Sequence, residues 1–409
     1  MQSPCNISGK AAVLAALMAL AAAPALAEDH GETWRLFVAD HTLPVVRALD
    51  AKSGAELGHF DLAGHAALSL SDSGKTVFAV QGEKDRVEII STGIALSDHG
   101  EHRDIEIAAP ALLPSLIQGL KPGHVVTHGD DVAVFYDRGG KADLFLESEL
   151  LDGGKSSKSV DTTVPHHGVA VPMGHHVLVS VPNLDATVKP DELPPRFGLR
   201  VLERSGEQMG EAVACTDLHG EATSARLVAF GCKEGVLIAR PGGLDGPKLE
   251  MLAYDETLPE GKVSTLLGGK AMQVFLGNYG EDRLVLIDPD SATPYRLVEL
   301  PTRRIDFALD PANLRNAYIL TEDGKLHVLD IVSGKIVRSA GVTEPYSKDG
   351  HWRDPRPRLA VAGGEIAITD PRHGLVRMID SETLLEARTI AVEGQPFAIV
   401  AVGGSGKTH

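Results

Sequence analysis

The sequence predicts an all-β protein, a β-propeller of eight blades, and three observations lead to this fold class. Helical periodicity is scarce, whereas short apolar or alternating runs bounded by Gly, Asp and Pro recur, for example at residues 76–80, 132–136 and 284–287. Several runs end in Asp, and two continue to Ser-Gly, at residues 50–54 and 330–334, where the carboxylate can cap a tight hairpin. The third observation is a repeat of about 47 residues, which is typical of blades with three or four strands.

The repeat is defined by the apolar stretches that we expect to form the first strand of each blade. These stretches start near His65, His124, His167, His219, Val263, Ile305, Arg358 and Pro396. Eight starts predict eight blades, and seven blades is the alternative because the spacing is uneven. The last stretch leaves no room for three further strands, and residues 34–50 lack a first strand before them. We therefore expect one domain over residues 34–409, closed by pairing of the N- and C-terminal strands, which removes an exposed sheet edge.

The first 27 residues match a secretory signal peptide. Lys10 supplies the positive charge, residues 11–20 form an apolar run, and residues 25–27 match the small-x-small pattern that signal peptidase cleaves. The alternative is a membrane anchor, but the run is shorter than the about 20 residues that a spanning helix needs. We expect cleavage before Glu28, export to the periplasm, and a mobile acidic segment over residues 28–33.

Composition and charge exclude several classes of ligand. Apolar residues make up 43% of the chain, enough for a large core, and the net charge of −17 has the wrong sign for binding nucleic-acid phosphates. Residues 401–408 resemble a phosphate-binding loop, but Ala401 replaces the required glycine and no room remains for the helix that would hold phosphate. We expect neither a nucleic acid nor a nucleotide, and no later stretch is long enough to span a membrane.

The cysteines fit an oxidising compartment. Cys5 leaves with the signal peptide, and Cys215 and Cys232 remain. We expect a disulfide between them that closes a short loop and stabilises the fold by roughly 3 kcal/mol in the chain-entropy model. A pair of thiolate metal ligands is the alternative, and it would favour a closer spacing such as Cys-x-x-Cys.

The histidines are the candidate metal ligands because they recur in phase with the repeat. His65, His124, His167 and His219 stand where four successive first strands begin, and first strands line the channel of a propeller. Neutral imidazole is the commonest zinc ligand, so we expect a zinc site where these strands begin. Further candidates are Asp40, in the loop after a second strand, His128, four residues beyond His124, and His166, although alternation lets only one of His166 and His167 face the site. Ordinary channel histidines are the alternative interpretation, and nickel or copper(II) are alternative metals.

A second, weaker metal site is predicted at the mature N-terminus. Asp29, His30 and Glu32 lie together there, and the same pattern recurs at residues 98–101. Carboxylates and an imidazole on a mobile segment suit an exchangeable ion. The alternative is a solvated polar tail.

With its acidic, His-bearing segment at residues 28–32 and histidines at the channel, the chain resembles the periplasmic zinc metallochaperones of the AztD type. The resemblance implies tight zinc binding and delivery to the solute-binding protein of a zinc ABC transporter. The alternative function is a propeller hydrolase or lactonase that uses the metal as a Lewis acid. A site closed by four protein ligands suits storage, whereas three protein ligands and a water suit catalysis.

Overall fold

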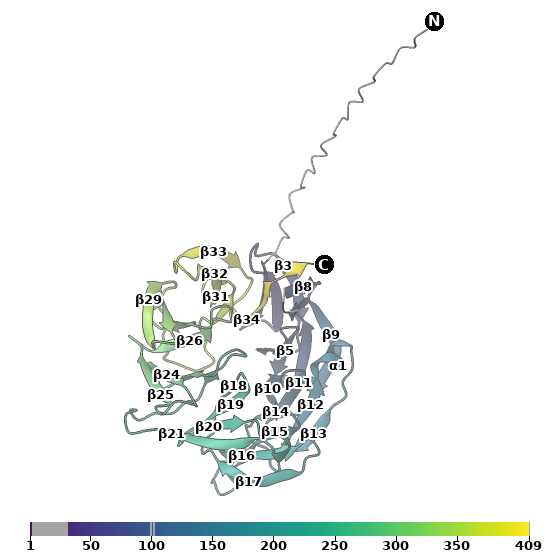
Figure 1. Cartoon of the computed structure of the whole chain (residues 1–409), viewed down its shortest axis with the longest axis vertical. Helices are drawn as coiled ribbons and strands as arrows, with labels where there is room; N and C mark the ends of the chain where they lie inside the picture. The colour runs from purple at the N-terminus through teal and green to yellow at the C-terminus, as the bar shows by residue number, and fades with distance from the viewer. Residues whose placement is uncertain (2–31, 99, 101–102, 409) are drawn as a thin grey trace.

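The computed structural model describes residues 32–98, 100 and 103–408, together with Met1. Within these residues, eight four-stranded antiparallel sheets follow one another around a ring, in the order of the chain from β5 through β18 to β34 (Figure 1). The prediction of an eight-bladed propeller is confirmed. The first strands begin within about three residues of the predicted positions.

The strands of each blade are given from the centre of the ring outward. Blade 1 contains β34 (Pro396–Ser405), β1 (Glu32–Asp40), β2 (Val45–Asp50) and β3 (Glu56–Asp61). Blade 2 contains β4 (Ala67–Leu70), β5 (Thr76–Gln81), β6 (Arg86–Ser91) and β9 (Ala111–Gln118), with the 3-10 turn η1 (Gly82–Lys84) after β5. Blade 3 contains β10 (Pro122–His128), β11 (Asp131–Tyr136), β12 (Lys141–Leu146) and β13 (Lys158–Asp161), with helix α1 (Glu147–Leu151) before β13. Blade 4 contains β14 (Ala170–Met173), β15 (His176–Pro182), β16 (Arg196–Glu203) and β17 (Gln208–Ala214).

The second half of the ring repeats the same order. Blade 5 contains β18 (Glu221–Ser224), β19 (Leu227–Gly231), β20 (Gly235–Arg240) and β21 (Lys248–Ala253), with η2 (Gly243–Asp245) before β21. Blade 6 contains β22 (Leu266–Leu267), β23 (Phe275–Asn278), β24 (Arg283–Ile287) and β25 (Tyr295–Glu299). Blade 7 contains β26 (Arg304–Leu309), β27 (Asn316–Thr321), β28 (Lys325–Asp330) and β29 (Lys335–Gly341). Blade 8 contains β30 (Leu359–Ala362), β31 (Glu365–Asp370), β32 (Leu375–Asp380) and β33 (Glu386–Ala391). A small extra sheet outside the blades joins β7 (Ile94–Asp98), β8 (Arg103–Ile107) and β35 (Lys407–Thr408).

The ring closes through the two ends of the chain. Strand β1 pairs antiparallel with β34, with Arg35 opposite Val402 and Phe37 opposite Val400. This pairing confirms the predicted closure, and it places the phosphate-loop look-alike in strand rather than in a loop before a helix. Strand β1 already begins at Glu32, so the propeller includes two residues of the segment expected to be mobile.

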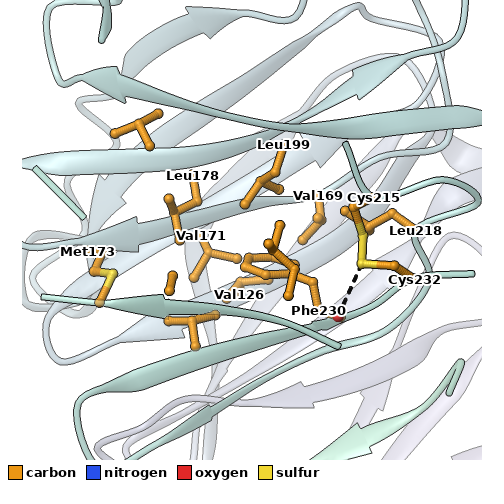
Figure 2. Close-up of a cluster of buried hydrophobic side chains, with 14 residues drawn as sticks. Val126, Val169, Val171, Met173, Leu178, Leu199, Cys215, Leu218, Phe230 and Cys232 are labelled. Atoms are coloured by element: carbon orange, nitrogen blue, oxygen red, sulfur yellow. Dashed lines mark hydrogen bonds between the residues drawn. A yellow bond between two sulfur atoms is a disulfide. The ribbon is translucent and has the colours of Figure 1, made fainter. Parts of the chain in front are cut away.

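Burial follows the position of a strand within its blade. Middle strands such as β5 are buried along their whole length because the faces of neighbouring blades pack on both sides of them, whereas outermost strands such as β33 are mostly exposed, with Ile390 buried. One apolar cluster joins blades 3, 4 and 5 through Val126, Val171 and Phe230 (Figure 2). This cluster packs β10 and β14 against β19 of blade 5.

The predicted disulfide between Cys215 and Cys232 is confirmed, and both residues are completely buried at the edge of the same cluster (Figure 2). Among the described residues, no helix has the length and apolar character needed to cross a bilayer. Every first strand begins, and every second strand ends, on the same face of the ring, which we call the mouth.

Candidate metal centre

Three of the four predicted histidines come together at the mouth. His124 lies near the start of β10, His167 precedes β14 and His219 precedes β18, so three successive blades each supply one imidazole. The Nε2 atoms of His124 and His167 are 3.4 Å apart, with ring centroids 4.9 Å apart. The ring centroid of His219 lies 6.1 Å from that of His167. His167 is thus the middle member of the set, which we call the histidine triad.

Glycines next to His124 and His219 leave room for close contacts beside the triad. A Cβ at Gly123 would lie 2.5 Å from the Oδ1 of Asp137, so the carboxylate can sit against the backbone beside His124 only because this residue is glycine. Gly220, next to His219, has a φ of +78° and packs against the backbone of Ser264. The recurring Gly-His and His-Gly pairs of the sequence therefore have a structural cause.

Each ring of the triad has an oxygen acceptor near its Nδ1 atom. The Nδ1–H of His167 donates to the Oδ2 of Asp137 at 2.7 Å, and that of His219 donates to the carbonyl oxygen of Ser264 at 2.8 Å. The Nδ1 of His124 lies 3.8 Å from the Oε1 of Glu221. Carboxylate and carbonyl oxygens only accept, so the proton of a neutral His167 or His219 ring sits on Nδ1 and its lone pair is on Nε2, whereas the 3.8 Å contact of His124 is too long for a hydrogen bond. His167 and His219 therefore each offer a free Nε2 lone pair of the kind that binds a metal.

The spacing of the first pair matches one edge of a zinc tetrahedron. Two nitrogens bound to the same zinc at 2.0–2.1 Å in tetrahedral geometry lie about 3.3–3.4 Å apart. His124 and His167 already have this separation between their Nε2 atoms. Across the described residues, no three His, Cys, Asp or Glu side chains form a ready-made metal site.

Charge around the triad is mixed. Burial disfavours the charged form of His124, but its interaction with Glu221 and the charge of Asp137 outweigh burial and raise the pKa of His124 above its ordinary value. Burial lowers the pKa of His219, and the nearby Arg196 guanidinium adds to that effect. Arg196 also donates from Nη1 to the carbonyl oxygen of His167 at 2.7 Å. Two carboxylates and one half-buried cation thus lie beside the three imidazoles.

The sequence did not identify Asp137, Glu221 or Arg196. Asp137 is buried, and its Oδ1 atom has no hydrogen-bond partner, which leaves one acceptor beside the triad unused. A partial signal was present, because Asp137 directly follows the second strand β11 and Asp40 is the last residue of the second strand β1. Asp137 in blade 3, and not the predicted Asp40 in blade 1, contacts a member of the triad.

The structure places the remaining candidate ligands apart from the triad. Asp40 caps its own loop, since its Oδ1 accepts from the backbone N–H groups of Thr42 and Leu43 and its Oδ2 accepts from that of Gln395. His65 is exposed beside β4, and within the described residues it makes none of the ring or hydrogen-bond contacts that join the triad.

The last two candidates on the first strands are engaged with their own surroundings. His166 is fully buried, its Nδ1 hydrogen-bonded to the carbonyl oxygen of Val164 and its Nε2 to the hydroxyl of Ser180, and burial lowers its pKa. His128 is held by the carbonyl oxygen of Pro172 through Nδ1. In the N-terminal candidate site, Asp29 and His30 lie outside the described residues, and Glu32 is exposed on β1, where it accepts from the indole N–H of Trp34.

Comparison with known proteins gives one close family. No family model matches the chain. The chain is 46% identical over 394 residues to "Zinc chaperone AztD" of Citrobacter koseri, covering 96% of this chain and 92% of that protein. The crystal structure of Citrobacter koseri AztD and that of its apo form match with TM-scores of 0.89 and 0.87 at 46% and 45% identity, covering 93% and 92% of this chain and all of each solved chain. Dihydro-heme d1 dehydrogenase NirN matches at 13% identity with a TM-score of 0.58, over 89% of this chain and 74% of that one, and shares the fold alone.

Proposed function

The chain belongs to the AztD family of zinc chaperones, and from this premise we propose that it binds zinc in the periplasm and delivers it to the solute-binding protein of a zinc ABC importer. We place the zinc cargo at the histidine triad, His124, His167 and His219. The observation that carries this placement is the pair of Nε2 atoms 3.4 Å apart, from two neighbouring blades, with the Nδ1–H of His167 held by Asp137.

The geometry suits a protein that binds zinc and must also release it to a partner. Three imidazoles leave one position of a zinc tetrahedron for water or for a donor from another protein. An incoming ligand can take that position before the first imidazole leaves, so zinc passes over without being released as a bare ion. His167 is 42% exposed, which puts the middle ligand within reach of a partner at the mouth. Membership of a zinc chaperone family favours this role over the hydrolase or lactonase alternative.

Asp137 and Glu221 support the imidazoles from behind. A carboxylate that accepts from Nδ1–H orients the ring and makes Nε2 a better donor to a metal. Both carboxylates also compensate the charge of the bound dication in a half-buried site. His65, Asp40, His166 and His128 stay predictions as ligands, and so does the weaker site of Asp29, His30 and Glu32.

The test is zinc affinity measured by competition with a chelator, followed by transfer to the zinc-free solute-binding protein. We expect one tightly bound zinc in the unmodified protein and its loss in the double variant His124→Ala, His167→Ala. His59→Ala is the matched control, because His59 also lies near two carboxylates, Glu56 and Asp61, but on the outermost strand of blade 1. Unchanged zinc binding in the double variant would remove the triad from the function.

A further inference from the structure

We propose that the disulfide between Cys215 and Cys232 is a positioning device for His219, which makes full zinc affinity dependent on oxidation of the exported chain. The inference rests on the zinc site proposed above and concerns its assembly. The ring of His219 lies further from the ring of His167 than the ring of His124 does. The position of His219 therefore depends most on the segment that carries it.

The segment that carries His219 runs from Cys215 to Gly220 and connects β17 of blade 4 to β18 of blade 5. Its start is fixed to blade 4, where the N–H of Cys215 donates to the carbonyl oxygen of Phe197 at 2.9 Å. Its end is fixed to blade 5, where the N–H of His219 donates to the carbonyl oxygen of Gly231 at 2.9 Å. The disulfide lies between these two anchors and joins the blades covalently.

The disulfide and His219 are linked through one shared carbonyl oxygen, that of Gly231. Cys232 follows Gly231 in the chain, and the Sγ of Cys215 lies 3.8 Å from the same Gly231 carbonyl oxygen that accepts from His219. The bond therefore fixes the incoming segment against the acceptor that holds the backbone of His219. A displacement of this segment would also move the ring away from its Nδ1 acceptor, the carbonyl oxygen of Ser264.

The other two ligands have supports of their own. His124 is part of β10, and His167 is held through its side chain by Asp137 and through its carbonyl oxygen by Arg196. Loss of the disulfide should therefore affect one ligand out of three and weaken zinc binding without abolishing it. Removal of an interaction that orients a ligand typically costs a factor of about 10 to 100 in metal affinity.

The chemistry of assembly is thiol–disulfide exchange. The two thiols give up two protons and two electrons to a disulfide-bearing oxidant of the exporting compartment, which is reduced to its dithiol. Both sulfurs are then completely buried against the cluster of Val169, Leu218 and Phe230 (Figure 2). A buried bond of this kind persists once formed, so the device acts once, when the chain folds after export.

The experiment compares zinc affinity, by chelator competition, in the unmodified protein and in the variant Cys215→Ala, Cys232→Ala. We expect an affinity about 10- to 100-fold weaker in the variant. In a His219→Ala background, the same cysteine changes should alter affinity less than about twofold, since the ligand that they position is gone. The control Tyr346→Phe removes a buried 2.6 Å hydrogen bond to Asp370 in blade 8, and so lowers stability without touching this segment.

Equal affinity with and without the cysteines would overturn the inference, and so would an equal further loss in the His219→Ala background, which indicates general loosening. Absence of tight zinc binding in the unmodified protein would instead contradict the proposed function. If circular dichroism shows that the alanine pair does not fold, Cys215→Val with Cys232→Ala restores most of the buried volume and is measured in the same way.

Discussion

Replacement of Asp137 by Asn tests whether the carboxylate behind His167 tunes the zinc site. The change keeps the shape of a buried side chain whose Oδ2 accepts from the Nδ1–H of His167 at 2.7 Å, but it removes the negative charge. A neutral amide polarises the imidazole less, so Nε2 becomes a weaker donor to zinc. Loss of such a partner costs about 10- to 100-fold in metal affinity, or about 1.4–2.7 kcal/mol.

The assay is chelator competition at fixed pH and ionic strength, with Asp40→Asn measured beside Asp137→Asn. Asp40 is a buried aspartate at the same position of blade 1, and its oxygens are occupied by backbone N–H groups of its own loop and of Gln395. We expect Asp40→Asn to lower stability and leave zinc affinity within about twofold, because no triad member contacts it. An unchanged zinc affinity in Asp137→Asn would refute the reasoning. An equal loss of affinity in Asp40→Asn would also refute it, and would make Asp40 the ligand candidate.

Four further outcomes are expected. The double variant His124→Ala, His167→Ala should retain no tightly bound zinc by elemental analysis after gel filtration, whereas retention of one equivalent would place the cargo elsewhere. Acidification should release zinc, because protons compete with zinc for the imidazole nitrogens. Since the pKa of His124 is raised, this competition should begin at a higher pH than at an ordinary imidazole. A zinc affinity that is independent of pH between 7.5 and 5.5 would contradict this. Deletion of residues 28–31, which spares β1, should leave the triad loaded but slow zinc transfer to the partner, and transfer at the full-length rate would make this segment an ordinary polar tail. Burial lowers the pKa of His327, so below about pH 6.5 the unfolded chain binds a proton that the folded chain does not bind. The free energy of unfolding should therefore fall there by up to about 1.4 kcal/mol per pH unit. His327→Gln should flatten this slope in urea titrations, and an identical slope in both proteins would contradict the assignment.

The fold was predictable because its signals are local and repeated. Short strands in the same order recur in every blade, and Asp-capped turns recur in several of them, so errors of two or three residues at single strands do not accumulate. Ring closure was predictable for the same reason, since residues 34–50 and residues 395–402 are incomplete blades that complement each other. The extra sheet of β7, β8 and β35 breaks the repeat and was not foreseen.

The candidate site was predictable only as far as phase within the repeat determines position. Phase brought His124, His167 and His219 to adjacent blades, but it cannot say which way a side chain turns outside a regular strand. His65 has the same phase as the triad, yet within the described part of the chain it makes none of the ring contacts that join the triad. Asp137 was missed because its role depends on a hydrogen bond between blades, and no local pattern encodes such a contact.

Zinc-edge anomalous diffraction from crystals of the zinc-loaded protein tests the central claim most directly. The account predicts a strong anomalous peak at the mouth, about 2.0–2.1 Å from the Nε2 atoms of His124, His167 and His219. A strong peak at any other place, with none beside these three imidazoles, would contradict it.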